Sequence, residues 1–283
     1  MITQPGIYDI PLTDYIADPC PEPSLSASIA SVLIGQSPLH AFMRHPRLNP
    51  GGEREESTKA DIGTIAHGVL LENDWSRVVV IDLDDWRTKV AKESRDAAYA
   101  AGKVPMLAKQ ERPLRKMVDE ARKAIANSEL ADVWGNGKAE QTLVWQEGDI
   151  WLRSRPDWLA NDHSLIIDYK TTTGSAEPNS WMRTALGNGN DLQAVLGLRG
   201  IKALTTGGAN CKFVFMVQEQ DAPYAVSFVG LDPVFLDMAE HKLERAITLW
   251  RDCITTNTWG GYPSRICWMS PPAWAYTEEE MKS

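Results

Sequence analysis

The sequence has few cysteines, no long apolar run and no excess of basic residues. Its four cysteines among 283 residues form no C-x-x-C pair, which argues against a disulfide scaffold and a closely spaced metal cage. The longest apolar runs, such as 78–81 and 213–217, are far shorter than the roughly 20 residues of a membrane span. The N-terminus lacks the basic start and apolar core of a secretory signal. We therefore expect a cytoplasmic protein with reduced thiols and no association with membranes.

The charge balance is acidic, with 29 Lys and Arg against 38 Asp and Glu, a net charge of -9 and a pI of about 5.1. This argues against a protein that coats nucleic acid. It does not exclude a locally basic groove for DNA, with acidic residues outside it or at a metal site. The hydrophobic fraction of 43% and the charged fraction of 24% are ordinary for a globular protein.

The hydrophobic pattern changes period along the chain, which predicts a mixed α/β fold. We expect one domain over 1–283, with an extended arm at 1–25, a catalytic core at 60–230 and a C-terminal helix and Trp- and Pro-rich tail at 233–283. A polar loop is expected at 49–59. Helical spacing predicts helices at 24–33, 62–72, 109–127, 191–198 and 233–254, and a charged helix or loop at 87–101. Strands are predicted at 77–81, 140–145, 150–155, 164–169, 212–217 and 224–229, of which the second to fourth would form a meander.

The segment from Arg155 to Thr173 carries the most chemical information. Asp168 and Lys170 are two residues apart on a predicted strand, so they share one face of it. Tyr169 then points the other way, and its backbone carbonyl is expected near the same site. If this strand pairs with the strand before it as a hairpin, Asp157 comes to lie beside Asp168.

Two neighbouring carboxylates repel each other, and a divalent cation such as Mg²⁺ or Mn²⁺ removes that conflict. A lysine beside the metal can orient a water or stabilise the transition state of phosphodiester hydrolysis. A lone D-x-K is commonly a solvated ion pair, but the apolar residues before Asp168 indicate a central strand. Glu140 opens the first predicted strand of the meander. His67 lies on an apolar helix, where it is either a structural residue or a neutral imidazole ligand.

Pro156-Asp157 and Asp168-Tyr169-Lys170 look like the PD-(D/E)xK nuclease signature. The G-T-I-A-H motif at 63–67 and Glu140 resemble the RecB-like branch of these nucleases. The order of short motifs along nearly the whole chain is similar to the RecE-like exodeoxyribonuclease VIII family. These motifs lie at 5–8, 14–15, 25–28, 37–38, 63–72, 139–145, 153–157, 166–172 and 272–275.

The resemblance implies a restriction-endonuclease-like core with a central mixed sheet flanked by helices. It implies that His67, Asp157, Asp168 and the carbonyl of Tyr169 hold Mg²⁺ or Mn²⁺. Lys170 would be the catalytic lysine, and Glu140 would orient water or hold a second metal. The activity implied is metal-dependent degradation of linear double-stranded DNA from 5′ to 3′, leaving 3′ strands for a RecT-like annealing protein. It also implies a homo-oligomeric ring, a trimer or tetramer, encoded by a phage or prophage.

The sequence departs from the RecB-like pattern in two places. These nucleases usually carry a Q-x-x-x-Y helix, and here Gln193 fits but Gly197 stands in place of the tyrosine. Gln193 is still expected to contact the active site or DNA. Some relatives hold an iron–sulfur cluster with four cysteines; Cys211, Cys253 and Cys267 are too widely spaced for that cage, so we expect no iron–sulfur cluster.

Several cations and hydroxyls are candidates for DNA contacts. Arg155 is two residues from Asp157, and the hydroxyls after Lys170 could bind a phosphate or cap the strand. The cations near residue 87 could equally form a solvated helix face. The DNA-binding candidates are Arg153, Arg155, Arg87 with its neighbours Lys89, Lys92 and Arg95, Thr171, Thr172, Thr173 and Gln193.

Two other functions stay open on the sequence alone. One is a Cas4-like or restriction-like endonuclease or end trimmer, which cutting of covalently closed circular DNA would favour. The other is a DNA-end-binding recombination accessory protein with little catalysis, which end binding without a Mg²⁺-dependent product would favour.

Overall fold

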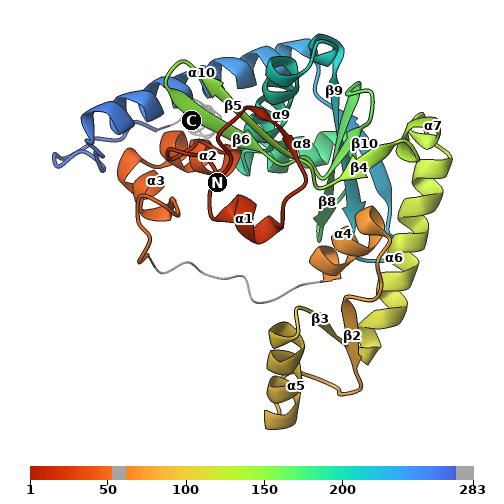
Figure 1. Cartoon of the computed structure of the whole chain (residues 1–283). Coiled ribbons are helices and arrows are strands. Elements are labelled where there is room, and N and C mark those ends of the chain that lie inside the picture. Colours follow the sequence, from red (N-terminus) through yellow and green to blue (C-terminus); the bar gives the residue numbers. More distant parts are fainter. Residues whose placement is uncertain (53–61, 272–283) are drawn as a thin grey trace, which may run out of the picture.

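The computed structural model describes residues 1–52 and 62–271 (Figure 1). Most of the loop expected at 49–59, the end of the C-terminal tail and the motif at 272–275 lie outside the described residues. No helix of the described residues combines the length and apolarity needed to cross a membrane.

A five-stranded mixed sheet forms the centre of the protein. Its order is β10-β9-β8-β7-β4, and the central strand β8 runs parallel to β9 and antiparallel to β7. The apolar start of β8 is buried, as expected for a strand covered on both faces. The bounds of these strands are Val226–Gly230 (β10), Lys212–Glu219 (β9), Leu165–Thr172 (β8), Trp158–Ala160 (β7) and Gly137–Ala139 (β4).

Two smaller sheets accompany the central one. An antiparallel sheet has the order β1-β5-β6, and β2 and β3 form a parallel pair. The bounds are Gly6–Tyr8 (β1), Thr142–Glu147 (β5), Ile150–Ser154 (β6), Val78–Ile81 (β2) and Val104–Leu107 (β3).

Helices cover both faces of the central sheet and bury two hydrophobic clusters. Ile166 belongs to the cluster under α9, α2, α8 and α10, whereas Ile167 and Tyr169 belong to the cluster under α4 and α6. The period of two along β8 therefore sends successive side chains to opposite faces. The helices are Leu12–Ile16 (α1), Ala27–Gly35 (α2), Pro38–Arg44 (α3), Ile62–Glu72 (α4), Lys89–Ala100 (α5), Ala108–Ala126 (α6), Ala131–Trp134 (α7), Pro178–Gly187 (α8), Asn190–Leu204 (α9) and Pro233–Thr256 (α10), and Gly208–Asn210 forms a short 3-10 helix.

Local capping explains where several of these helices begin. The Ser26 side chain accepts a hydrogen bond from the backbone N–H of Ile29 at the start of α2. Asp232 caps α10 in the same way, and a proline occupies the first turn of α10, where its missing N–H costs nothing.

The expected α/β fold with a central mixed sheet flanked by helices is confirmed, but two expectations were wrong in detail. The three-strand meander is divided between two sheets, because β6 ends at Ser154 and a separate three-residue strand, β7, pairs with β8 instead. The first 25 residues are more than an extended arm. They form β1, which pairs with β5, and α1, and they bury Asp18, Cys20 and Leu25.

Candidate active site

Asp157 reaches the central strand through β7. The pairing of Trp158 with Ile167 brings Asp157, one residue earlier, to the level of Asp168. The Oδ2 atom of Asp157 accepts a hydrogen bond of 2.7 Å from the backbone N–H of Tyr169. The expected proximity of Asp157 to the Asp168 strand is therefore present, although β7 provides it and the strand that ends before Asp157 does not.

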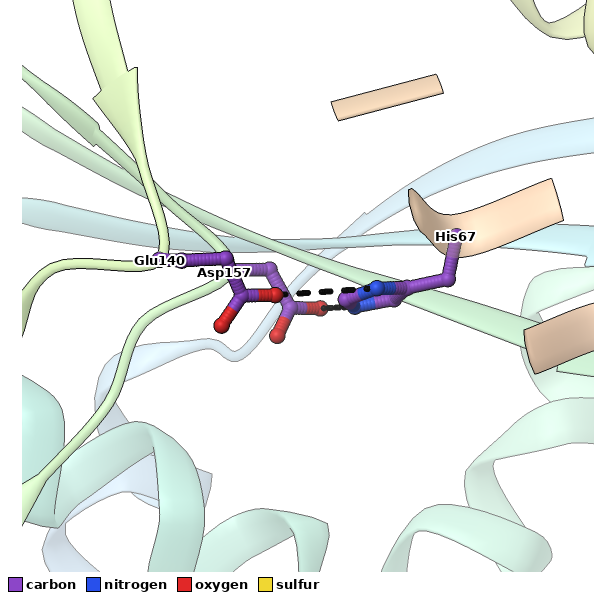
Figure 2. A group of neighbouring side chains, drawn as sticks. All are labelled: His67, Glu140 and Asp157. Atoms are coloured by element: carbon purple, nitrogen blue, oxygen red, sulfur yellow. Dashed lines mark ion pairs between the residues drawn. The ribbon is translucent and has the colours of Figure 1, made fainter. Parts of the chain in front are cut away.

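His67 comes to the same place from α4. Its Nε2 atom lies 3.0 Å from Asp157 Oδ2, and its Nδ1 atom lies 3.7 Å from Glu140 Oε1. Figure 2 shows the imidazole pointing toward both carboxylates. The ring also stacks on Tyr169 with 6.0 Å between ring centroids.

A glycine lets α4 approach β8 this closely. A Cβ atom at Gly63 would lie 2.2 Å from Thr171 Oγ1, well inside van der Waals contact. A larger residue at Gly63 would have to displace the side chains of Thr171 and Gln220 or move α4, which carries His67, away from the strand.

Asp168 and Lys170 share one face of β8, as the period of two predicts. Lys170 Nζ lies 2.7 Å from Asp168 Oδ2. On the same side, Gln193 of α9 donates a hydrogen bond of 2.5 Å to Asp168 Oδ1. The expected contact of Gln193 with the candidate site is therefore present.

Glu140 lies between β4 and β5 and does not open a strand, contrary to the expectation. Its backbone has a φ of +55°, and its backbone N–H donates to the carbonyl of Asp157 over 2.8 Å. Its Oε2 atom lies 2.6 Å from Arg155 Nε. Arg155 also donates through Nη1 to Thr142 Oγ1 and to the carbonyl of Ile10, so two of its three guanidinium nitrogens have partners within the protein.

The charged groups perturb one another strongly. Burial and the neighbouring Asp157 raise the pKa of Asp168 to about 6, against the opposing effect of Lys170. Burial would also raise the pKa of Asp157, but the charge and hydrogen bond of His67, the charge of Lys170 and the Tyr169 N–H together hold it below its ordinary value. Burial would lower the pKa values of His67 and Lys170, yet the carboxylates raise both. The site is a dense cluster of coupled charges, typical of a functional site.

The donor set fits a divalent cation. The ligand atoms of His67, Glu140 and Asp157 lie within 4.8 Å of one another. Asp168 Oδ2 is buried and has no hydrogen-bond partner among the described residues, although Lys170 lies beside it as an ion pair. One imidazole and several carboxylate oxygens are ligands that Mg²⁺ and Mn²⁺ accept. Asp168 is not part of the closest group of ligand atoms; its share in holding a metal stays a prediction, as does that of the Tyr169 carbonyl.

Three other candidate DNA-binding residues have partners within the protein. Arg153 is 3% exposed, and its guanidinium pairs with Asp18 and donates to Ser24, so it is not presented to a phosphate. Thr171 Oγ1 accepts from Gln220, and Thr172 Oγ1 accepts from the N–H of Gly174. These hydroxyls act within the protein, in line with the strand-capping alternative.

Arg87 has the opposite environment. Its side chain is 91% exposed and lies 3.8 Å from Asp85, just before α5. No contact in the described chain joins it to the candidate site, so its role in binding DNA stays a prediction.

The structure adds residues that the sequence did not single out. A cleft of about 370 Å³ opens onto the part of the candidate site formed by His67, Glu140, Asp157 and Gln193, whereas Asp168 and Lys170 do not line it. Its other lining residues include Leu12 and Tyr15 of α1 and Ser28 and Ser31 of α2. We call it the site cleft. The short motifs at 14–15 and 25–28 include Tyr15 and Ser28 but assign them no role, and only the folding of this segment onto the sheet brings them here.

This sheet with its strand-end carboxylates and lysine defines a PD-(D/E)xK-type core. Residues 46–268 match the family described as a PDDEXK-like domain of unknown function (DUF3799). The chain belongs to this family, and so to the PD-(D/E)xK nuclease superfamily.

One solved structure supports the same fold. A crystal structure from Eubacterium rectale described as a "putative exonuclease" has a TM-score of 0.58 and 12% identity, covering 95% of this chain and 98% of that chain. A second structure, of SSO0001, has a TM-score of 0.26 and 11% identity over 65% of this chain and 87% of that chain; this likeness carries no argument. A search of curated proteins finds no match.

Proposed function

We propose that this protein is a metal-dependent exonuclease that degrades linear double-stranded DNA from 5′ to 3′. The observation that carries the proposal is the convergence of His67, Asp157, Asp168 and Lys170 at one end of β8, beside a cleft. Each carboxylate has an ion-pair partner, but a cluster of four ionisable side chains at a largely buried position is costly and is typical of a functional site. Membership of the PD-(D/E)xK superfamily supports phosphodiester hydrolysis as that function.

In this proposal, some residues bind the metal ion and others fix the orientation of its carboxylate ligands. His67, Asp157 and Asp168 hold Mg²⁺ or Mn²⁺, and Glu140 lies close enough to assist through a water or a second ion. A bound cation of this kind supplies a Lewis acid for the phosphate and lowers the pKa of a water. The Tyr169 N–H fixes the rotamer of Asp157, and the Gln193 amide fixes that of Asp168.

Lys170 is the proposed catalytic lysine. Its ammonium stays protonated at neutral pH, because Asp168 and Asp157 raise its pKa despite burial. A fixed positive charge at this point stabilises negative charge that develops on a phosphate oxygen, and one of its N–H groups can orient a water. Lys170 thus acts as a charge and a hydrogen-bond donor.

Several finer parts of the proposal rest on the RecE-like resemblance. They are the direction of digestion, the 3′-strand product, the RecT-like annealing partner, the origin in a phage or prophage and a ring of three or four subunits. Light scattering tests the ring: we expect a particle of about three or four times the 31.5 kDa chain mass. A particle with the mass of one chain would remove the ring from the proposal and leave the nuclease chemistry standing.

The direct test uses linear duplex DNA carrying a label at one 5′-phosphorylated end, beside covalently closed circular DNA. We expect Mg²⁺-dependent digestion of the linear DNA alone, inhibition by EDTA and early release of the label. Asp168→Ala and Lys170→Ala should each lower the rate by at least about 10²-fold, while circular dichroism confirms that both variants fold. Arg245→Ala, a change at an exposed residue of α10, is the matched control.

The other outcomes distinguish the alternatives. Cutting of the closed circle by the wild type would indicate an endonuclease. A gel shift of the labelled duplex without any product would indicate an end-binding protein. Full activity in either active-site variant would contradict the assigned residues.

A further inference from the structure

A second cleft adjoins the site cleft and is unused by the proposed chemistry. It has a volume of about 570 Å³ and lies between α1, α2 and α3. Tyr15 and Ser28 line both clefts, so the two are neighbours that share a wall. We call the second one the side cleft. Its volume lies in the range of clefts that hold ligands about the size of a nucleotide.

The lining of the side cleft is partly apolar and partly polar. Two of its apolar side chains, Ile16 and Met43, are 51% and 54% exposed. Exposed apolar side chains beside polar ones suit a ligand that has both flat apolar faces and polar groups, such as a nucleotide.

The charge of the side cleft has the sign that DNA requires. The described residues that line it include Arg44, Arg153 and His40 but no Asp or Glu, in a chain with a net charge of -9. Arg153 is committed to the buried Asp18. Arg44, at the end of α3, is exposed and has no ion pair or side-chain hydrogen bond within the described chain, so its guanidinium is available for a phosphate.

The shared wall is held firmly. The guanidinium carbons of Arg153 and Arg155 lie 5.4 and 5.9 Å from the centre of the Tyr15 ring. Arg155 also pairs with Glu140 of the candidate site. Tyr15 therefore lies between the site cleft and the side cleft, held by contacts with both arginines.

We propose that the side cleft binds unpaired nucleotides of DNA, continuous with the strand that enters the site cleft. The bases pack on Ile16, Met43 and the wall at Tyr15, and Arg44 contacts a phosphate. This proposal rests on the proposed function, since it extends the DNA path beyond the cleavage site. It also means that a few base pairs open before the strand is cut.

The test measures binding of a fluorescein-labelled oligothymidylate by anisotropy as a function of salt. EDTA is present throughout, so that no metal-dependent cleavage occurs. Removal of one phosphate contact lowers the slope of log affinity against log salt by about 0.7 for a single strand. We expect this change for Arg44→Gln and an unchanged slope for Arg245→Gln, the exposed control on α10.

The apolar wall gives a second, independent signature. The double variant Ile16→Ser, Met43→Ser should bind about threefold more weakly or worse at every salt concentration, with the slope of the wild type. Met238→Ser, which alters a methionine that is 65% exposed on α10, should bind as the wild type does. Because the altered side chains are all largely exposed, the variants should fold, and thermal melts verify this.

Two results would overturn the side cleft as a single-strand site. One is a wild-type slope and affinity for Arg44→Gln. The other is an equal loss of affinity by Arg44→Gln for a covalently closed circular duplex, which has no end that can open. Failure of the proposed function would give a different result: the wild type would leave linear DNA intact in Mg²⁺, whatever the binding measurements show.

Discussion

Asp18, a buried carboxylate outside the candidate site, anchors the N-terminal segment to the protein. Its oxygens lie 3.2 Å from Arg153 Nη1, 3.3 Å from His45 Nε2 and 2.7 Å from Ser24 Oγ. The side chains of Asp18 and His45 are fully buried. Because a buried charge without its partner is strongly destabilising, each member of this group depends on the others.

This network predicts a pH dependence of stability. Burial would raise the pKa of Asp18, but the hydrogen bond from His45, the charge of Arg153 and the bonds from Ser24 bring it below the ordinary 3.8. The folded-state pKa is thus below the unfolded one, so the stabilisation is complete above about pH 3.8 and is lost as the pH falls through the folded-state value. Asp18→Asn should lower the unfolding free energy by about 3 to 5 kcal/mol at pH 7.

Urea unfolding at pH 7, 5 and 3 checks this prediction. The difference between the wild type and Asp18→Asn should be constant from pH 7 to 5 and smaller at pH 3. Asp9→Asn, at an exposed position of the same segment, serves as the control and should change little. A difference that stays the same down to pH 3 would show that Asp18 does not act through its charge.

At the level of single residues, the sequence predicts only part of the candidate site. Asp157, Asp168 and Lys170 could be found because a strand imposes a period of two on neighbouring residues. The ion pair of Glu140 with Arg155 could not, since it depends on a positive φ at Glu140 and on the path of the chain between two sheets. Arg153 looked available for DNA because a sequence shows a charge and not its burial.

In helix α9, packing against the sheet explains a glycine that the motif spacing alone did not explain. Gly197 stands where related nucleases place a tyrosine. A Cβ there would lie 3.3 Å from Phe213 and 3.4 Å from Ile166. The helix therefore lies on the sheet at this residue, and an aromatic side chain does not fit.

Substitutions at Gly197 should follow this geometry. Gly197→Ala should change the unfolding free energy by less than about 1 kcal/mol, because the better helix propensity offsets a tight contact. Gly197→Tyr should destabilise by about 1 to 3 kcal/mol or more through overpacking. The urea midpoint measures both. Stability equal to the wild type in Gly197→Tyr would show that this face has room for the side chain.

The elements themselves were predicted unevenly. Long amphipathic helices such as α6 and α10 were predicted within a few residues, because their apolar positions repeat over many turns. The three-residue strand β7 was missed, and with it the division of the meander between two sheets. A segment of three residues is too short to show a hydrophobic period.

For the whole molecule, the N-terminal segment is the largest departure from expectation. Proline and aspartate suggested an exposed arm, yet β1 completes a sheet with β5, and Arg155 donates to the carbonyl of Ile10. Tyr15 forms a wall of the site cleft. Sequence composition reports how polar a segment is, but a few buried contacts are enough to hold it in place.

Removal of residues 1–22 should therefore harm the entire fold. It exposes the edge of β5 and leaves Arg153 buried without Asp18, which alone costs about 3 to 5 kcal/mol. Since a typical domain is stable by only about 5 to 15 kcal/mol, we expect a large fall in the melting temperature or a loss of cooperative melting. A variant lacking only residues 1–3 keeps β1 and Asp18, so it should melt close to the full chain. If the longer deletion also melted like the full chain, the N-terminal segment would be an appendage after all, and both clefts would have to work without the wall that Tyr15 provides.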